Sequence, residues 1–141
     1  MRIVLDTNVL LISLPKVSRY KPIFESLINH KIELLISNEI ILEYLEIIGN
    51  KTTEAIALNV TELLITLRNV IRVEPHFRWN LIRNDADDNK FVDCAISGAA
   101  DFIVTNDSHF NELKEIDFPK VLTLTADEFL ELVMNIDKKN M

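Results

Sequence analysis

Ile3-Val4-Leu5-Asp6-Thr7-Asn8 opens the chain with a short apolar run that stops at an acid. Such a bounded run is typical of a buried strand, and helical patterns separate it from four similar runs further on. These are Ile32–Ile36, Val70–Val73, Phe102–Val104 and Val121–Leu124. Alternating apolar runs and helices predict an α/β fold with a central parallel sheet of about five strands and helices on both faces. We expect residues 1–141 to form one such domain.

The helices between these strands carry recognisable signals. Ser37 is a good cap for a helix that runs through Ile48, and Thr125-Ala126-Asp127-Glu128 is a capping box before Phe129–Ile136. Apolar spacing predicts four more helical segments, at Thr7–Ser13, 23–28, 52–68 and 88–100.

The composition excludes several kinds of site. Two glycines in 141 residues rule out a glycine-rich phosphate loop or dinucleotide fingerprint, and a single cysteine rules out an internal disulfide. The three histidines are too far apart for a local zinc motif. No apolar run has the ~18–20 residues of a membrane helix, and no targeting segment is visible, so we expect a cytoplasmic protein without membrane contact.

Carboxylates are the most abundant ionisable side chains in this sequence. The chain has 22 Asp and Glu against 15 Lys and Arg, for a net charge of −7, and residues 85–141 hold thirteen of the acids but only five of the basic residues. A net acidic chain is a poor general binder of polyanions. The acids therefore form an interaction surface, a solvated face or a cation site, and their positions in the fold distinguish between these three interpretations.

Two acids directly follow strands of the expected sheet. Asp6 comes after Ile3-Val4-Leu5, and Asp107 lies just past Ile103-Val104-Thr105, so both are placed at the carboxyl edge where open parallel sheets bind ligands. Asp101 precedes its strand and belongs to the opposite edge.

Helices directed at this edge can add further acids. Glu39 and Glu43 can share one side of the helix capped by Ser37. The helix dipole alone explains an acid at Glu39, so Glu43, one turn further in, is the better candidate.

The densest acidic group comprises Asp85, Asp87, Asp88 and Asp93. Asp88 shares a helix face with Phe91 and points toward the core side, although an ordinary cap explains it equally well. Asp93 is about 140° further round the helix, and Asp85 and Asp87 are interpreted as surface charge.

Four carboxylates at one edge would repel one another and raise their own pKa values. A hard divalent cation such as Mg²⁺ or Mn²⁺ removes this repulsion, and one or two such ions can activate water and stabilise the oxygens of a phosphodiester under attack. No Ser-His-Asp or Cys-His arrangement competes, and Cys94 is interpreted as a core residue.

The sequence resembles the PIN-domain ribonucleases, in particular the VapC-like branch assigned as toxin components of toxin–antitoxin systems. Four segments in the family's order carry the resemblance: Ile3–Leu10, Ser37–Glu43, Asp87–Ala95 and Ala100–Asp107. Each segment alone is a weak signal, but four in order with the usual spacing form a specific one.

The resemblance implies a PIN fold, Mg²⁺ or Mn²⁺ dependence and endonucleolytic cleavage of single-stranded RNA. It also implies a homodimer and a small antitoxin protein as partners. It assigns the metal-binding catalytic quartet and, as supporting residues, Asn8 and Thr105, which hold the acids by hydrogen bonds, and Asp93. The quartet is Asp6, Glu43, Asp88 and Asp107.

Some residues match the pattern of this family less directly. The branch often has Gly before its last acid, where this chain has Asn106, a residue that tolerates left-handed backbone angles. His109 follows closely and has no assigned role. Basic side chains could guide an RNA backbone past the acids, or could be ordinary solvated residues: Lys16, Arg19, Lys21 and Lys90. Phe77 and Trp79 could stack bases, although packing is the simpler interpretation.

Two other functions remain open. A catalytically silent PIN module would act only in protein association. A Mg²⁺-binding phosphoacceptor domain is also small, acidic and α/β, but it needs an acidic pair after the first strand and a lysine after the last, where this chain has Asp6-Thr7 and Thr125-Ala126.

Overall fold

The computed structural model describes residues 1–139 and contains one five-stranded parallel sheet, in the order β3-β2-β1-β4-β5. The strands are β1 (Arg2–Leu5), β2 (Glu33–Ile36), β3 (Val70–Arg72), β4 (Phe102–Val104) and β5 (Thr123–Leu124). β1 is the centre of the sheet, where Ile3 is in register with Leu34 of β2 and with Phe102 of β4. The expected α/β fold with a parallel sheet of about five strands is confirmed.

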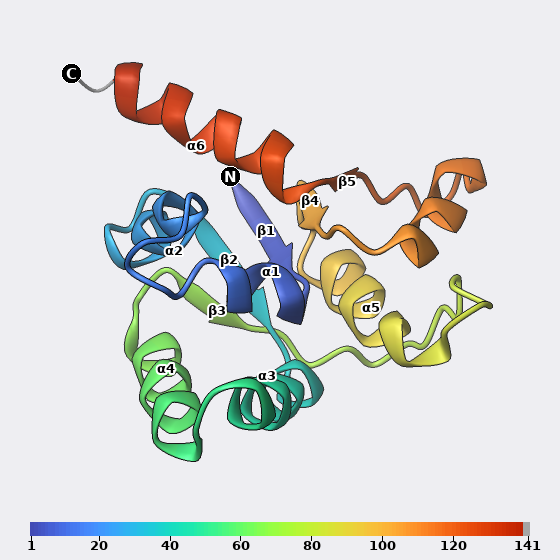
Figure 1. The fold of residues 1–141 in the computed structure, drawn as a ribbon. Helices are drawn as coiled ribbons and strands as arrows, with labels where there is room; N and C mark the ends of the chain where they lie inside the picture. Colours follow the sequence, from blue (N-terminus) through green and yellow to red (C-terminus); the bar gives the residue numbers. More distant parts are fainter. Residues whose placement is uncertain (140–141) are drawn as a thin grey trace.

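Helices connect the strands and cover the sheet (Figure 1). They are α1 (Thr7–Ile12), α2 (Lys21–Ile28), α3 (Asn38–Lys51), α4 (Glu54–Thr66), α5 (Asn89–Ser97) and α6 (Ala126–Lys139), with two 3₁₀ segments, η1 (Ala86–Asp88) and η2 (Ser108–Glu115). Within residues 1–139, no helix is both long enough and apolar enough to cross a bilayer.

The central strand shows that both faces of the sheet are covered. Ile3, Val4 and Leu5 point alternately to opposite faces, and each side chain is fully buried. A strand buried on both sides has no polar face, which is why this segment reads as a continuous apolar run. α5 packs against β1, β2 and β4, while α3 and α4 lie side by side as a helical hairpin (Figure 1).

The predicted caps form as expected. Ser37 Oγ accepts a hydrogen bond from Ile40 N, and the Thr125–Glu128 capping box closes in both directions at 3.0 and 3.1 Å. The predicted helix over 52–68 is shorter, because Thr53 caps it and it begins at Glu54. The last helix is longer than predicted and continues to Lys139.

A buried tyrosine ties α3 to the central strand. Tyr44 is fully buried, and its hydroxyl donates a 2.6 Å hydrogen bond to the carbonyl oxygen of Leu5. Leu5 precedes Asp6 and Tyr44 follows Glu43, so this bond fixes the position of two candidate site residues relative to each other.

Replacing Tyr44 by Phe removes this bond from a buried site. We expect the free energy of unfolding, measured by urea denaturation, to fall by about 1–2 kcal/mol. Tyr20→Phe is the matched control, because the Tyr20 hydroxyl bonds to Asp127 in an exposed position and its loss should cost less than about 0.5 kcal/mol. Equal losses in both variants would contradict a special role for the Tyr44 bond.

Candidate active site

The strand order reverses direction at the centre of the sheet. The chain steps outward from β1 to β2 and β3, and then returns to β4 on the other side of β1. Open parallel sheets form their ligand crevices at such a point, outside the carboxyl ends of the two central strands. Asp6 follows β1 and Thr105 follows β4, and the backbone N–H of Asp6 donates to Val104 O at 3.0 Å.

Asp6 lies buried in this crevice and accepts a 2.7 Å hydrogen bond from the hydroxyl of Thr105. It precedes α1, but its carboxylate makes no capping hydrogen bond to that helix. Burial raises the pKa of Asp6, the Thr105 hydrogen bond opposes that rise, and the negative charges of Glu43 and Asp107 add to it. A helix-capping role therefore does not explain this residue.

Glu43 joins Asp6 from α3. The hydroxyl of Thr7, the residue after Asp6, donates to one Glu43 carboxylate oxygen, and Lys90 Nζ lies 2.7 Å from the other. Glu39 lies on the same helix but is exposed and pairs with Arg78 at 3.1 Å. The structure therefore turns Glu43, and not Glu39, toward Asp6.

Asp88 reaches the crevice from the start of α5. It makes no capping bond to α5, and its Oδ2 atom is buried without a hydrogen-bond partner among residues 1–139. Burial raises the pKa of Asp88 to about 7, and the negative charges of Asp85, Asp107 and Asp6 contribute to the rise. A buried carboxylate oxygen with no donor fits a cation ligand and does not fit a helix cap.

Asp107 completes the group and is half-buried at the start of η2. Its backbone N–H donates to Thr105 Oγ1 at 3.0 Å, and its carboxylate accepts from His109 N at 2.9 Å. The Asn106 side chain accepts a 2.9 Å bond from Ala126 N, and its backbone does not adopt a positive φ. The turn before Asp107 therefore needs no residue with left-handed backbone angles.

The three supporting residues differ in position. Thr105 bridges Asp6 and the Asp107 backbone. Asn8 is exposed on α1, and its side chain makes no hydrogen bond within residues 1–139. Asp93 is buried but accepts from Trp79 N at 3.0 Å, so it holds the loop before α5 and does not face the other acids.

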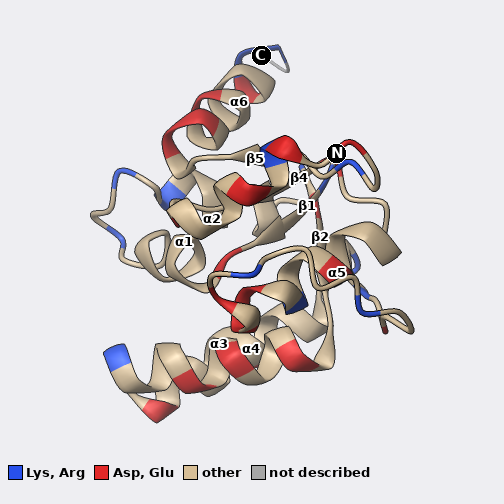
Figure 2. Cartoon of the chain, turned by 90° about the vertical axis from the view of Figure 1, so that its right-hand side faces the viewer, with Lys and Arg blue, Asp and Glu red and all other residues tan. Residues whose placement is uncertain are grey.

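The candidate RNA-guiding residues are mostly engaged in contacts. Arg19 pairs with Asp127 at 2.9 Å, and Lys21 Nζ donates to Leu14 O at 3.0 Å, while Lys16 is exposed. This basic loop lies apart from the acids (Figure 2). Lys90 is nearly buried between Glu43 and Asp87 and serves as a counter-charge inside the acidic group.

The structure also shows the positions of the aromatic residues considered for base stacking and of the single cysteine. Phe77 is exposed and contacts Trp79 edge to face, so it is not a core residue. Cys94 is buried, and burial raises the pKa of its thiol to about 12, which makes it inert as a nucleophile.

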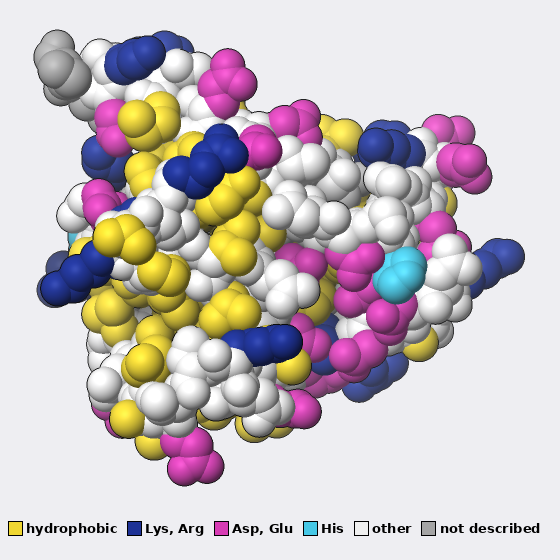
Figure 3. All heavy atoms as spheres, in the orientation of Figure 1, with side chains coloured by type: hydrophobic (Ala, Val, Ile, Leu, Met, Phe, Trp, Pro, Cys, Tyr) yellow, Lys and Arg dark blue, Asp and Glu magenta, His cyan; other side chains and the backbone are white. Residues whose placement is uncertain are grey.

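Sequence reasoning missed two residues of this region. Asp85 was interpreted as surface charge and His109 had no role, yet His109 Nδ1 lies 3.6 Å from Asp85, 3.5 Å from Asp88 and 3.2 Å from Asp107. Figure 3 shows acidic side chains gathered around a histidine on one face of the molecule. The spacing Asp107-Ser108-His109 was the available signal, because an Asp that bonds the N–H two residues later folds that residue back beside it.

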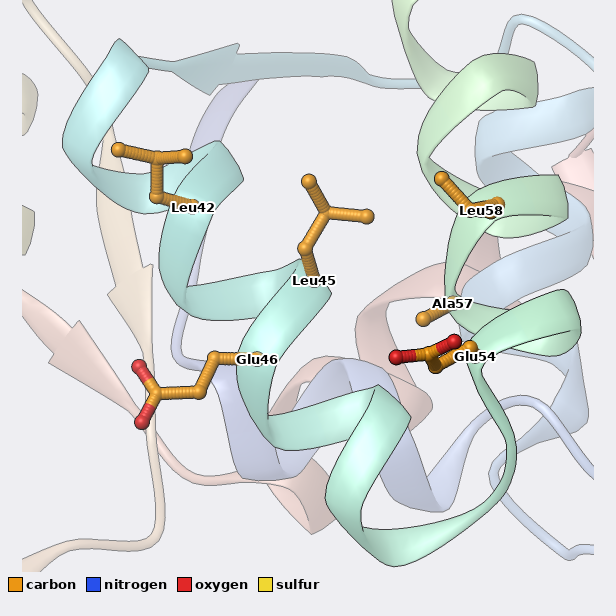
Figure 4. A pocket seen from close by; sticks show the side chains of 6 residues that line it. All are labelled: Leu42, Leu45, Glu46, Glu54, Ala57 and Leu58. Carbon is orange, nitrogen blue, oxygen red and sulfur yellow. The ribbon is translucent and has the colours of Figure 1, made fainter.

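A separate groove of about 440 Å³ lies between α3 and α4 (Figure 4). Leucine and alanine side chains line most of it, and its two carboxylates, Glu46 and Glu54, lie on different helices and do not point at one another. The groove offers apolar surface but no convergent polar groups, so the acidic crevice is the better candidate for chemistry.

The raised pKa of Asp88 predicts a pH-dependent stability in the absence of divalent metal. The folded protein binds the Asp88 proton more tightly than the unfolded chain, whose ordinary value is 3.8, so stability is lost as pH rises toward 7. Asp88→Asn cannot ionise and should be more stable than the wild type by on the order of 1 kcal/mol at pH 8, and by much less at pH 4.

Thermal unfolding in a metal chelator at both pH values measures this difference. Asp87→Asn is the control, since Asp87 is exposed and pairs with Lys90, and its substitution should give no gain at pH 8. A gain for Asp88→Asn that is equal at the two pH values would rule out ionisation as its cause.

Comparison with known proteins places this arrangement in a family. The sequence model of the PIN domain matches residues 2–109, a span that includes all four quartet acids. A search of curated proteins found no significant match. Among solved structures, the chain is similar to one in the crystal structure of VapBC2 from Rickettsia felis bound to a DNA fragment from their promoter. The TM-score is 0.61 at 17% identity, over 89% of this chain and 98% of that one, a likeness that shows the fold alone. The family match, the strand order and the acidic crevice agree, and this chain belongs to the PIN domain family.

Proposed function

We propose that this chain is a metal-dependent endoribonuclease that cleaves single-stranded RNA as the toxin of a toxin–antitoxin pair. One observation carries the proposal: four distant segments bring Asp6, Glu43, Asp88 and Asp107 to one crevice, where Asp88 Oδ2 is buried without a hydrogen-bond partner in residues 1–139. Membership of the PIN domain family supports it, because PIN domains are generally nucleases.

The quartet fits Mg²⁺ or Mn²⁺, because each acid offers hard oxygen ligands and their accumulated charge is only partly neutralised by the chain. A bound divalent ion would neutralise the acids, lower the pKa of water and stabilise charge on a phosphodiester. One or two ions could be held by this number of carboxylates.

The chain's own residues orient these acids. The Thr105 hydroxyl donates to Asp6 and accepts from Asp107 N, so one side chain fixes the acids that follow β1 and β4. Thr7 holds one oxygen of Glu43, and Lys90 balances the charge on the other. Asn8 is exposed on α1, and Asp93 supports the loop that leads to Asp88.

The RNA and protein partners are further parts of the proposal. Lys16, Arg19 and Lys21 form the basic loop that would contact an RNA backbone. The solved structure with a similar fold is described as VapBC2 bound to a promoter DNA fragment, which supports a partner protein for this chain. We also propose that the chain forms a homodimer and acts in the cytoplasm.

The activity test compares two glutamates on one helix. With Mn²⁺ or Mg²⁺, the wild type should cleave single-stranded RNA, and Asp6→Asn or Glu43→Gln should lower the rate by about 100-fold or more, because each removes charge that the cation needs. Glu39→Gln should remain within about twofold of the wild type. Purified protein and a fluorescently labelled RNA oligonucleotide are sufficient for this assay.

Two results would contradict the proposal. Cleavage by Asp6→Asn at the wild-type rate would show that the crevice does not perform the reaction. An equal loss of cleavage rate in Glu39→Gln and Glu43→Gln would show that the assay reports damage to α3 and not the loss of a site acid.

A catalytically silent module is the second candidate, and the groove in Figure 4 favours it. Leu42 and Leu58 line this groove and are 65% and 53% exposed, and exposed apolar patches are typical of protein interaction sites. Calorimetric titration with Mn²⁺ separates the two functions, because a silent module would fold normally without binding the ion. A phosphoacceptor domain is not supported, since its usual strand order is 2-1-3-4-5 and this sheet has 3-2-1-4-5.

A further inference from the structure

His109 and Asp85 lie beside the quartet but have no part in the function proposed above. The described residues contain one group of three or more potential ligands whose donor atoms lie close enough to hold a metal ion, and it comprises Asp85, Asp88 and His109. Their donor atoms all lie within 4.8 Å of one another. This group shares Asp88 with the quartet, but it adds a nitrogen ligand that the quartet lacks.

Two atoms in this group are buried without a hydrogen-bond partner among residues 1–139: Asp88 Oδ2 and His109 Nδ1. Asp88 as a whole is only 9% exposed. These atoms face each other across 3.5 Å, which is too long for a well-formed hydrogen bond, although the His109 contact opposes the rise in the pKa of Asp88. Buried polar atoms without partners are rare in folded proteins, and a missing ion is one recognised cause.

The distances from the imidazole nitrogen of His109 to the carboxylates suit a single ion. Ligands about 2.1 Å from a metal and about 90–110° apart are separated by roughly 3.0–3.5 Å. The distances from His109 Nδ1 to the three carboxylates are 3.2, 3.5 and 3.6 Å. Asp85 uses its Oδ1 to cap η1, and this leaves Oδ2 as the atom directed at His109.

Hydrogen bonds outside the group hold its two halves in place. Glu112 of η2 accepts from Arg83 N and Asn84 N at 3.0 and 3.2 Å, so the segment with His109 is tied to the loop before Asp85. The Asn89 side chain makes two further bonds to Ile82, which close the same loop onto α5. The group is therefore preorganised by the fold and is not a chance meeting of exposed acids.

We propose that Asp85, Asp88 and His109 form a nitrogen-containing metal position next to the nuclease quartet, with Asp107 at its margin. Its role would be that of a second ion site beside the quartet, and this role rests on the function proposed above. Imidazole together with carboxylates favours Mn²⁺ and other transition metals over Mg²⁺, which prefers an all-oxygen environment. Binding through Nδ1 requires the neutral tautomer of His109 with its proton on Nε2.

A metal-free explanation competes with this one. A protonated His109 would itself be the counter-charge for the surrounding carboxylates, and no ion would then be needed. The two explanations differ in one measurable property, because only metal binding places the imidazole nitrogen within the first coordination sphere of an added ion.

The test uses the full chain with Mn²⁺ alone. Pulsed electron paramagnetic resonance should detect coupling of bound Mn²⁺ to a ¹⁴N nucleus in the wild type. His109→Ala should lose this coupling, and at one Mn²⁺ position the dissociation constant from calorimetry should rise ~10-fold or more. His76→Ala is the matched control, because His76 is an exposed loop residue, and it should keep both properties.

Absence of ¹⁴N coupling in the wild type, or its persistence in His109→Ala, would overturn the proposal. The wild-type measurement decides the question even if a variant does not fold. Asp6→Asn separates this inference from the nuclease proposal, because it should abolish RNA cleavage while the ¹⁴N coupling remains. Coupling without any RNA cleavage in the wild type would reject the nuclease and keep the metal position.

Discussion

The repulsion between carboxylates that the fold forces together is the constraint on which this site depends. Like charges about 4 Å apart near a protein surface repel by about 4 kcal/mol. Burial is the largest cause of the raised pKa values of Asp6 and Asp88. The charges of Glu43 and Asp107 add to the rise at Asp6, and those of Asp85, Asp107 and Asp6 add to the rise at Asp88. The fold tolerates them because β1, fully buried on both faces, and the bond from Tyr44 to Leu5 hold their backbone in place. The acids are thus kept close at a cost that other parts of the structure offset.

The chain neutralises only part of this charge, and it does so unevenly. Lys90 lies against Glu43, so this side of the crevice already has a cation of its own. Within residues 1–139, His109 is the basic side chain that lies against Asp88 and Asp107. An added cation therefore gains most on the Asp88 side. Burial is the largest cause of the raised pKa values of Asp88 and Asp6, and the neighbouring carboxylates add to both.

The sequence was most informative where one local rule decides the outcome. An apolar strand that ends in an acid places Asp6 at the carboxyl edge, and the choice of Glu43 over Glu39 needed only the position of each residue along α3. Contacts between distant segments could not be read in this way. Asp85 reaches His109 because Glu112 ties η2 to the loop before η1. The sequence also did not predict how α5 ends. The positive φ there belongs to Ala99 and not to Gly98. Gly98 is needed for another reason, because a Cβ at this position would lie 2.5 Å from Leu35.

Regular and irregular segments of the chain position different residues of the site. Asp6 is positioned by β1, which is buried on both faces, and Glu43 by α3, which packs Ile40, Tyr44 and Ile48 into the core. Asp85, Asp88, Asp107 and His109 are positioned by two 3₁₀ segments and a loop, whose geometry depends on a few side-chain hydrogen bonds. A bound ion would add stability here, since it links groups that the backbone alone does not. The irregular half of the crevice is therefore the half in which cation binding and local folding are expected to be coupled.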